Sequence, residues 1–299
     1  MPEPSPRWQL DAHTQLAGVL GYPARHSLSP AMHNAAFRAS GLNWVYLAFE
    51  VPPESLPQAI AGMRGLRIQG LNLTIPHKEA VMPQLDALTD AAQQIGAVNT
   101  LFWDGGRLVG DNTDAEGFLR ALQEGGVEPV RQNVLILGAG GAARAVAYAL
   151  HKQECRLWIA NRTLERAEML AQAFRATPIA MTPDALRPLI PQLDGVVNCT
   201  SLGMSPDTDS CPPMDWEALP DAAWACDLVY RPLHTRFLQD AAKRGVKTIN
   251  GLGMLIHQGA LAFERWTGQP APVMVMRQAA MQALVSEGKN ECPTNRILL

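Results

Sequence analysis

The chain lacks the features that mark several large classes of protein. Its 299 residues include no apolar run long enough to span a bilayer, and the opening MPEPSPRWQLDAHTQ lacks the apolar core of a secretory signal. Basic residues number 25 against 28 acidic ones, and they form no clusters. The sequence therefore offers no electrostatic basis for a nucleic-acid or membrane partner, and we expect a cytoplasmic protein that acts on a small molecule.

Cysteine is also sparse. The five cysteines, at positions 155, 199, 211, 226 and 292, are odd in number and include no C-x-x-C pair, so neither a disulfide framework nor a zinc site is indicated. The sequence has no H-E-x-x-H motif, no P-loop lysine and no G-x-S-x-G elbow. We predict no bound metal, and we interpret Cys199 as a packing residue because no base accompanies it.

Length and pattern indicate an α/β protein of two domains. A chain of this length with 47% hydrophobic residues can bury two cores, and apolar strands alternate with helices along it. We predict an N-terminal α/β substrate domain with a mainly parallel sheet, formed by residues 1–113 and 252–299. Residues 114–251 form a Rossmann-type cofactor domain, and helices over 254–266 and 272–286 return to the first domain. Residues 1–15 and 287–299 are expected to be tails.

The stretch NVLILGAGGAA, residues 133–143, organises the second domain. An apolar strand ends in the spacing G-x-G-x-x-A, in which Gly138 permits a tight turn, Gly140 lets the backbone approach a pyrophosphate, and Ala143 lets the following helix pack closely. A purely architectural turn is the alternative. The N-terminus of the following helix favours an anion. We therefore predict dinucleotide contacts here at Gly138, Ala139, Gly140, Gly141 and Ala142.

The residues after the next strand, 155–160, indicate the form of the dinucleotide. A fold that binds NAD places an acidic residue there for the ribose 2′-hydroxyl, whereas this chain has Asn161, Arg162 and Thr163, with Arg166 one turn further on. The planar guanidinium of Arg162 suits a 2′-phosphate, and Thr163 can cap the next helix and donate its hydroxyl. The pattern therefore predicts NADP rather than NAD.

Two serines stand near a helix start in the first domain. Ser29 precedes Pro30, which is typical of a helix N-terminus, so Ser29 is expected to cap a helix that runs to about Ala39. With Ser27 it also sets two hydroxyls beside the positive end of a helix dipole, which suits a carboxylate. Capping and binding are compatible, because one hydroxyl can accept and donate at the same time.

Further polar residues follow apolar strands of the first domain. In GLNLTIPHKE, Asn72 and Thr74 share one face of a strand, and His77 and Lys78 stand at its carboxyl end, where ligands bind in open α/β sheets. A solvated surface lysine is the alternative for Lys78.

Two later segments add an amide and an acid. Asn99 stands within the apolar IGAVNTL, and Asp114 follows the strand in LVGDNTDAEG. Each has a structural alternative, a turn for Asn99 and a helix cap for Asp114. A Lys78 and Asp114 pair in a cleft could move a proton on and off a substrate hydroxyl. In the second domain, the loop CTSLGMSP after strand 195–198 contributes Thr200 as an expected cofactor contact.

Seven segments, in this order and covering nearly the whole chain, resemble those of the shikimate dehydrogenases: HSLSPAMHN, NLTIPHK, GAVNTL, GDNTD, GAGGAAR, NRT and GLGML-x-x-Q. The resemblance implies the reversible NADP-dependent reduction of 3-dehydroshikimate to shikimate, a reaction of chorismate and aromatic amino-acid biosynthesis. It is carried by linked motifs, which makes it more specific than any one of them.

The resemblance also implies roles for single residues. Ser27 and Ser29 would bind the substrate carboxylate, and Lys78 and Asp114 would lie at the reacting centre. The family more often has Asn after its tyrosine, where this chain has Arg231 with His234 nearby. The remaining implied contacts are Thr74, Asn99, Tyr230 and Gln258 to the substrate, and Leu228 and Gly251 beside the nicotinamide.

Hydride transfer to a ketone requires a proton at the oxygen. We predict that Lys78 donates it in reduction and removes it in oxidation, that Asp114 orients the amine, and that His77 is the rival acid. We expect the reaction in a cleft hinged near Asp114 and Gly251. Two other functions stay open, a quinate/shikimate dehydrogenase that uses NAD and a non-catalytic NADP-binding sensor. The sequence leaves open whether the chain is a monomer or a homodimer.

Overall fold

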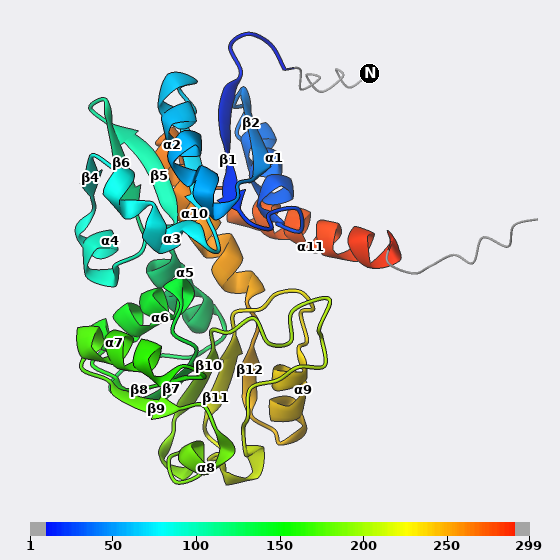
Figure 1. Cartoon of the computed structure of the whole chain (residues 1–299). Helices are drawn as coiled ribbons and strands as arrows, with labels where there is room; N and C mark the ends of the chain where they lie inside the picture. Colours follow the sequence, from blue (N-terminus) through cyan, green and yellow to red (C-terminus); the bar gives the residue numbers. More distant parts are fainter. Residues whose placement is uncertain (1–9, 291–299) are drawn as a thin grey trace, which may run out of the picture. The chain divides into compact units, whose positions relative to one another are not determined.

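A computed structural model describes residues 10–290, and it divides the chain into two compact units, each built around a six-stranded sheet (Figure 1). The first unit contains the described residues up to Ala87, then Asn99–Gly110 and those from Gly259 on; the second contains Leu88–Val98 and Asp111–Gln258. The α/β class predicted from the sequence is confirmed. The tails predicted at the two ends lie largely outside the described residues.

The sheet of the first unit has the strand order β2-β1-β3-β5-β6-β4. Strand β1 pairs in parallel with β2 and β3, whereas β3 pairs antiparallel with β5. Beyond β5 the chain turns back through the tight connection Gly105–Gly106 into β6, and both glycines have positive φ. The strands are β1 (Gln15–Gly21), β2 (Trp44–Glu50), β3 (Gly70–Leu73), β4 (Ala87–Leu88), β5 (Thr100–Asp104) and β6 (Arg107–Asp111).

Aromatic side chains pack one helix of the first unit against its sheet and its C-terminal segment. Phe37 of α1 stacks on Phe263 of α10 (Leu252–Thr267) at 5.4 Å between ring centroids and lies 5.3 Å from the Trp44 ring of β2. Met276 of α11 is fully buried, and α11 contacts α1. The C-terminal segment is thus part of the first unit, and this unit contains α1 (Ser29–Ala39), η1 (Pro53–Ser55), α2 (Leu56–Gly65), α3 (His77–Ala80), η2 (Met82–Gln84) and α11 (Val273–Asn290).

The sheet of the second unit has the order β12-β11-β10-β7-β8-β9, and its neighbouring strands pair in parallel throughout. Order and direction are those of a doubly wound Rossmann sheet, in which β7 stands where the chain reverses its winding. The strands are β7 (Asn133–Leu137), β8 (Arg156–Asn161), β9 (Thr177–Ala180), β10 (Gly195–Asn198), β11 (Trp224–Asp227) and β12 (Lys247–Ile249).

Both faces of this sheet are covered. Val134 and Ile136 of β7 point into a core shared with α5, α6 and α7, whereas Leu135 and Leu137 point into a second core shared with α8 and α9. Burial on both faces explains why the strand is uniformly apolar. The helices are α4 (Asp90–Ile95), α5 (Asp114–Glu124), α6 (Gly141–Lys152), α7 (Leu164–Phe174), α8 (Pro183–Leu186), η3 (Ile190–Gln192), η4 (Trp216–Ala218), α9 (Arg236–Lys243) and α10 (Leu252–Thr267), which continues into the first unit.

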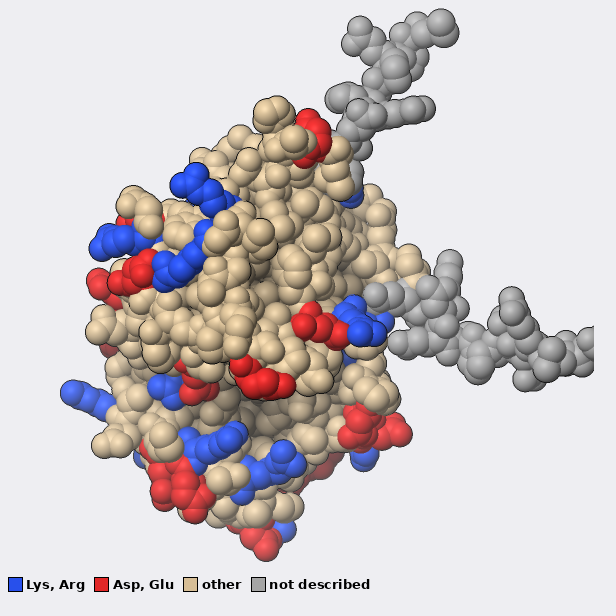
Figure 2. Space-filling view, turned by 45° about the horizontal axis from the view of Figure 1, so that its top comes forward, with Lys and Arg blue, Asp and Glu red and all other residues tan. Residues whose placement is uncertain are grey.

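The described surface agrees with the balanced charge of the sequence. On the face drawn in Figure 2, acidic and basic side chains are interspersed, and broad areas carry neither. Within residues 10–290, helices that combine the length and the apolar character needed to cross a bilayer are absent.

Candidate functional site

The glycine turn after β7 has the geometry that its spacing predicts. Gly138 has φ +108°, and a Cβ there would lie 3.2 Å from the carbonyl carbon of Cys199, so a larger residue would be strained and crowded. Its N–H donates to the Ala160 carbonyl at 2.7 Å. Ala143 is fully buried between helix and sheet. The turn therefore delivers the chain from β7 directly into the N-terminus of α6.

Gly140 is different, because packing does not require it. It is the exposed N-cap of α6, and a Cβ built on it would meet nothing within 4 Å. The missing side chain leaves open space at the positive end of a helix of 12 residues. The turn fits a group that needs close approach of the backbone and negative charge, such as a pyrophosphate. The five residues Gly138 to Ala142 all border this end of the helix.

The residues after β8 form a short polar loop. The Asn161 side chain donates to the Thr163 carbonyl at 2.9 Å and so holds the loop. Arg162 and Arg166 are exposed, and within the described part of the chain neither forms an ion pair. Thr163 is the N-cap residue of α7, as predicted, but its side chain makes no capping hydrogen bond. Its hydroxyl is thus not engaged by the helix.

The loop after β10 is fixed by hydrogen bonds of its own. The Asn198 carboxamide oxygen accepts from the Thr200 hydroxyl at 2.7 Å and from its N–H at 3.0 Å. The Thr200 hydroxyl in turn accepts from the N–H of Leu202 at 3.1 Å. Cys199 packs against the core, and burial raises the pKa of its thiol well above the usual range. The interpretation of Cys199 as a packing residue is confirmed.

Strand β11 ends earlier than the sequence predicts. The apolar run ACDLVY predicts a strand over 225–230, but β11 stops at Asp227. The Asp227 carboxylate accepts from the N–H of Val229 and turns the chain out of the sheet. Leu228 and Tyr230 therefore lie in a loop. A Cβ on Gly251 would lie 2.1 Å from the Leu228 carbonyl oxygen, so only glycine allows this approach.

Ser29 does not cap a helix as predicted. Helix α1 begins at Ser29, so Leu28 occupies the N-cap position, and its side chain makes no capping hydrogen bond. The reason is a turn before the helix, in which the Ser27 N–H donates to the Ala24 carbonyl and the Ser27 hydroxyl accepts from the Ser29 N–H at 3.3 Å. Ser29 is buried and Ser27 half-buried. Both still stand at the N-terminus of α1.

A buried hydrogen-bonded network, which no sequence pattern indicates, connects Tyr46, near Ser29, with Asn99. The hydroxyl of Tyr46 donates to the carboxamide oxygen of Asn72 at 2.7 Å. The Asn72 amide donates to the Asn99 carbonyl at 3.2 Å and to the Thr100 hydroxyl at 3.1 Å. That hydroxyl donates to the Asn99 side chain at 2.9 Å. Asn72 thus supports the strands rather than offering a polar face beside Thr74.

Burial perturbs one group of this network and one group beside it. It raises the pKa of Tyr46 well above its usual range. It lowers the pKa of His33 to about 3, so this imidazole, stacked 4.4 Å from the Tyr46 ring, is neutral at physiological pH. The network is therefore flanked by an aromatic layer without charge.

Lys78 and His77 share a single-turn helix after β3, and they differ in exposure. His77 is buried, and its Nε2 donates to the Val51 carbonyl at 2.7 Å, which leaves Nδ1 without a hydrogen-bond partner among the described residues. Lys78 is half-buried. Thr74 lies between β3 and this helix, and its carbonyl accepts from the His77 N–H. Because the Nε2 proton of His77 is hydrogen bonded to the backbone, His77 is less able than Lys78 to donate a proton to a substrate.

Asp114 belongs to the second unit and is buried at the start of α5. The preceding turn is held by side chains: the Asn112 carboxamide accepts from the Asp114 N–H at 3.1 Å and donates to the Ala97 carbonyl at 2.9 Å. Asp111 accepts from the Thr89 hydroxyl at 2.6 Å. The helix begins at Asp114 itself and Thr113 stands at the N-cap position, so the structural alternative for Asp114, a helix cap, does not hold.

Gln258 is also in the second unit. It lies on α10, and its amide donates to the Leu255 carbonyl at 2.7 Å. A Cβ on Gly117 would lie 2.7 Å from the Gln258 backbone nitrogen, so α5 and α10 pack closely at this point. Asp114 and Gln258 are thus held on two helices in direct contact.

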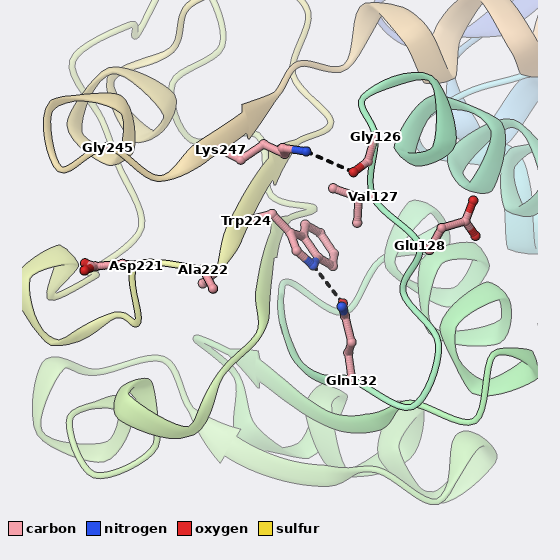
Figure 3. A pocket seen from close by; sticks show the side chains of 10 residues that line it. Gly126, Val127, Glu128, Gln132, Asp221, Ala222, Trp224, Gly245 and Lys247 are labelled. Carbon is pink, nitrogen blue, oxygen red and sulfur yellow. Dashed lines mark hydrogen bonds between the residues drawn. The ribbon is translucent and has the colours of Figure 1, made fainter.

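The described residues also line an open cavity of about 380 Å³ at the amino ends of β7, β11 and β12 (Figure 3). Two hydrogen bonds join residues of its lining: Lys247 donates to the Gly126 carbonyl at 2.9 Å, and the Trp224 indole donates to the Gln132 side chain at 2.8 Å. Ligands of open α/β sheets bind at the opposite, carboxyl edge, so we assign this cavity no ligand. Among the described residues, no group of three or more His, Cys, Asp or Glu could hold a metal.

Comparisons with known families match most of the chain. The model of the shikimate dehydrogenase substrate binding domain matches residues 19–101. The shikimate / quinate 5-dehydrogenase model matches residues 122–204, and that of the shikimate 5′-dehydrogenase C-terminal domain matches residues 251–281.

Individual relatives extend over both units. The shikimate dehydrogenase (NADP(+)) of Symbiobacterium thermophilum is 51% identical over 278 residues, which are 90% of this chain and 95% of the relative. The crystal structure of a shikimate 5-dehydrogenase from Thermus thermophilus, in complex with NADP(H) and shikimate, is 44% identical with a TM-score of 0.82 and covers 90% of this chain and 99% of its own. A shikimate dehydrogenase structure in complex with NADP+ is 43% identical with a TM-score of 0.86, over 92% of this chain and 98% of that chain.

Proposed function

Because this chain belongs to the shikimate dehydrogenase family, we propose that it catalyses the reversible NADP-dependent reduction of 3-dehydroshikimate to shikimate. The observation that carries the proposal is the 51% identity to a shikimate dehydrogenase (NADP(+)) over 90% of the chain, which spans both compact units. The reaction would serve chorismate and aromatic amino-acid biosynthesis.

The second unit would hold the dinucleotide. Its pyrophosphate would lie on the open space at Gly140 and the N-terminus of α6, against the backbone of Gly138 to Ala142. Arg162 and Arg166, with Asn161 and Thr163, would bind the 2′-phosphate, for which an exposed guanidinium is well suited. When bound, the nicotinamide supplies or accepts the hydride. Thr200, Leu228 and Gly251 complete the proposed cofactor contacts.

The first unit would hold most of the substrate. Ser27 and Ser29, at the positive end of α1, would bind the substrate carboxylate. Thr74 and Asn99 would bind the substrate hydroxyls. The network through Tyr46, which lies near Ser29, would then orient the Asn99 amide. Tyr230 and Gln258 of the second unit would add the remaining contacts. We propose that the boundaries between the substrate domain and the cofactor domain lie at residues 113/114 and 251/252.

The proton would be handled by Lys78. In reduction its ammonium donates a proton to the ketone oxygen as the hydride arrives at carbon, and in oxidation its amine removes the hydroxyl proton. Asp114 would orient the amine and accept a hydrogen bond from the substrate hydroxyl. The commitment of His77 to the Val51 carbonyl supports Lys78 over this histidine.

A cytoplasmic location is part of the proposal. The four cysteines of the described residues are free thiols, which suits a reducing compartment.

The deciding experiment measures initial rates for shikimate and quinate with NADP⁺ and with NAD⁺. We expect shikimate with NADP⁺ to be the fastest pair. Faster oxidation of quinate with NAD⁺ would favour the second candidate, a quinate/shikimate dehydrogenase, which one matched family model includes in its name. Binding of NADP⁺ without turnover of either substrate would instead indicate a non-catalytic sensor.

A further inference from the structure

A buried carboxylate outside the proposed site joins two loops of the second unit. Asp227, the last residue of β11, is fully buried. One carboxylate oxygen accepts from the Asn198 amide at 3.0 Å and from the Val229 N–H at 3.0 Å. The other accepts from the Thr235 hydroxyl at 2.6 Å. An ionised carboxylate only accepts, so it matches all three donors.

The partners of Asp227 extend its reach into the loop after β10. The Asn198 side chain, which donates to Asp227, accepts from the hydroxyl and the N–H of Thr200. Residues 199–203 and 228–235 are therefore both anchored to one carboxylate. The second loop is also fixed to Gly251, whose N–H donates to the Val229 carbonyl at 3.3 Å.

Strand order shows which part of a dinucleotide these loops would meet. β8, with Arg162 after it, neighbours β7 on one side, whereas β10 and then β11 follow on the other. A dinucleotide with its pyrophosphate on the turn after β7 and its 2′-phosphate after β8 extends its other half over the carboxyl ends of β10 and β11. The loops that Asp227 joins thus border the nicotinamide half.

We propose that Asp227 is a positioning residue for the nicotinamide half of the cofactor, acting through Asn198, Val229 and Thr235. The inference rests on the proposed function for the identity of the cofactor. It assigns Asp227 no contact with the cofactor or the substrate. Asp227 would hold the loops 199–203 and 228–235 at a fixed separation, so that the binding surface for the nicotinamide is already formed before the cofactor binds.

The experiment compares two ligands by isothermal titration calorimetry with the full chain. NADP⁺ carries both halves, and 2′,5′-ADP carries only the adenosine half with its 2′-phosphate. For Asp227→Ala we expect the Kd of NADP⁺ to rise about tenfold or more, while the Kd of 2′,5′-ADP stays within about twofold. Asp227→Asn keeps an oxygen for two of the donors, so we expect a smaller rise.

Thr235 provides a matched pair of variants. Thr235→Ser keeps the hydroxyl that donates to Asp227, whereas Thr235→Val removes it along with the cap of α9. Thr182→Val is the control, because Thr182 caps α8 in the same way without a carboxylate behind it. We expect Thr235→Val to weaken NADP⁺ binding more than Thr235→Ser does, and Thr182→Val to leave it unchanged.

The outcomes separate this inference from the proposed function. Equal loss of both ligands in Asp227→Ala and Asp227→Asn, or loss of neither, overturns the positioning role while the proposed function stands. If the parent protein binds neither ligand, both proposals fall together. A selective loss of NADP⁺ affinity that Asp227→Asn partly restores supports the inference.

Discussion

The hydroxyl of Tyr46 is a single group with consequences at two proposed substrate-binding positions. In Tyr46→Phe the carboxamide oxygen of Asn72 loses its donor inside the protein. We expect the free energy of unfolding to fall by about 1–3 kcal/mol, the cost of an unsatisfied buried acceptor, and the KM for shikimate to rise more than the KM for NADP⁺. Urea denaturation and initial-rate kinetics measure the two effects.

Tyr148→Phe is the matched control. Tyr148 packs against Phe174 through its ring, which the change leaves intact, so stability should stay within about 0.5 kcal/mol of the parent. Equal effects in the two variants would contradict the role of the buried network.

Lys78 carries the second prediction at this scale. If it is the general acid and base, Lys78→Met lowers kcat by about 10²–10⁴, and the KM for shikimate moves much less. Steady-state kinetics in both directions measure this.

Glu79→Gln, on the same single-turn helix and exposed, controls for damage to α3. A kcat for Lys78→Met within about tenfold of the parent would eliminate Lys78 as the proton donor.

Residues whose partners are close in sequence are the more predictable ones. The conformation of Gly138 follows from its place between a strand and a helix, and its positive φ agrees. Ser29 is an exception among residues with local partners: it is not the predicted cap, because the turn over 24–27 starts the helix one residue earlier. Tyr46 and Asn72 meet from positions 26 residues apart, a pairing that a sequence pattern does not encode. The catalytic and binding roles themselves stay predictions.

The loop after β8 is the element that would choose between the two dinucleotides. Arg162→Ala should raise the KM for NADP⁺ about tenfold or more and leave the KM for NAD⁺ nearly unchanged, because a charged hydrogen bond to the 2′-phosphate is worth about 1.5–3 kcal/mol. Initial rates with each cofactor give the ratio.

Arg175→Ala serves as control, since Arg175 follows the other end of α7. If Arg162→Ala raised both constants alike, the loop would not read the phosphate.

At the scale of elements, sequence reasoning locates strands well where apolar runs end in glycine or proline, and less well where a buried polar side chain ends them. β7 ends at Leu137, directly before Gly138, as its apolar run predicts. β11 stops three residues early because the Asp227 carboxylate captures the Val229 N–H, and burial of that side chain is a tertiary property.

At the scale of the whole molecule, two buried groups give opposite pH dependences to stability. Burial raises the pKa of Asp227 to about 6, from 3.8, so between these values the folded state holds the extra proton and stability falls as pH rises. Burial lowers the pKa of His33 to about 3, from 6.5, so the unfolded state holds the extra proton and stability rises with pH. Each contributes about 1.4 kcal/mol per pH unit at most, and the two oppose each other between about pH 4 and 6.

Single substitutions should expose each contribution. In Asp227→Asn the free energy of unfolding should rise more steeply with pH in this window than it does in the parent. In His33→Leu its slope against pH should be lower than in the parent. Urea denaturation at several pH values between about 4 and 6 measures both slopes. Slopes that change in the same direction in both variants would contradict these assignments.

The two-unit α/β organisation and the family are predictable because they depend on repeated patterns spread over the whole chain. A prediction based on several linked motifs and on the alternation of apolar strands with helices stays correct despite local errors. The capping role expected of Ser29 is one such error. Exact junctions depend instead on long-range packing, as in the segment Leu88–Val98, which belongs to the second unit although first-unit residues flank it.

The contact of α1 with α11 has a consequence for synthesis on the ribosome. α1 is among the first helices to emerge, and its partner α11 is the last helix of the described chain. At about 5–20 residues per second, the nascent α1 waits on the order of tens of seconds for that partner. Met32, Ala36 and Phe37, fully buried in the finished protein, are therefore the surface that a chaperone would shield during translation.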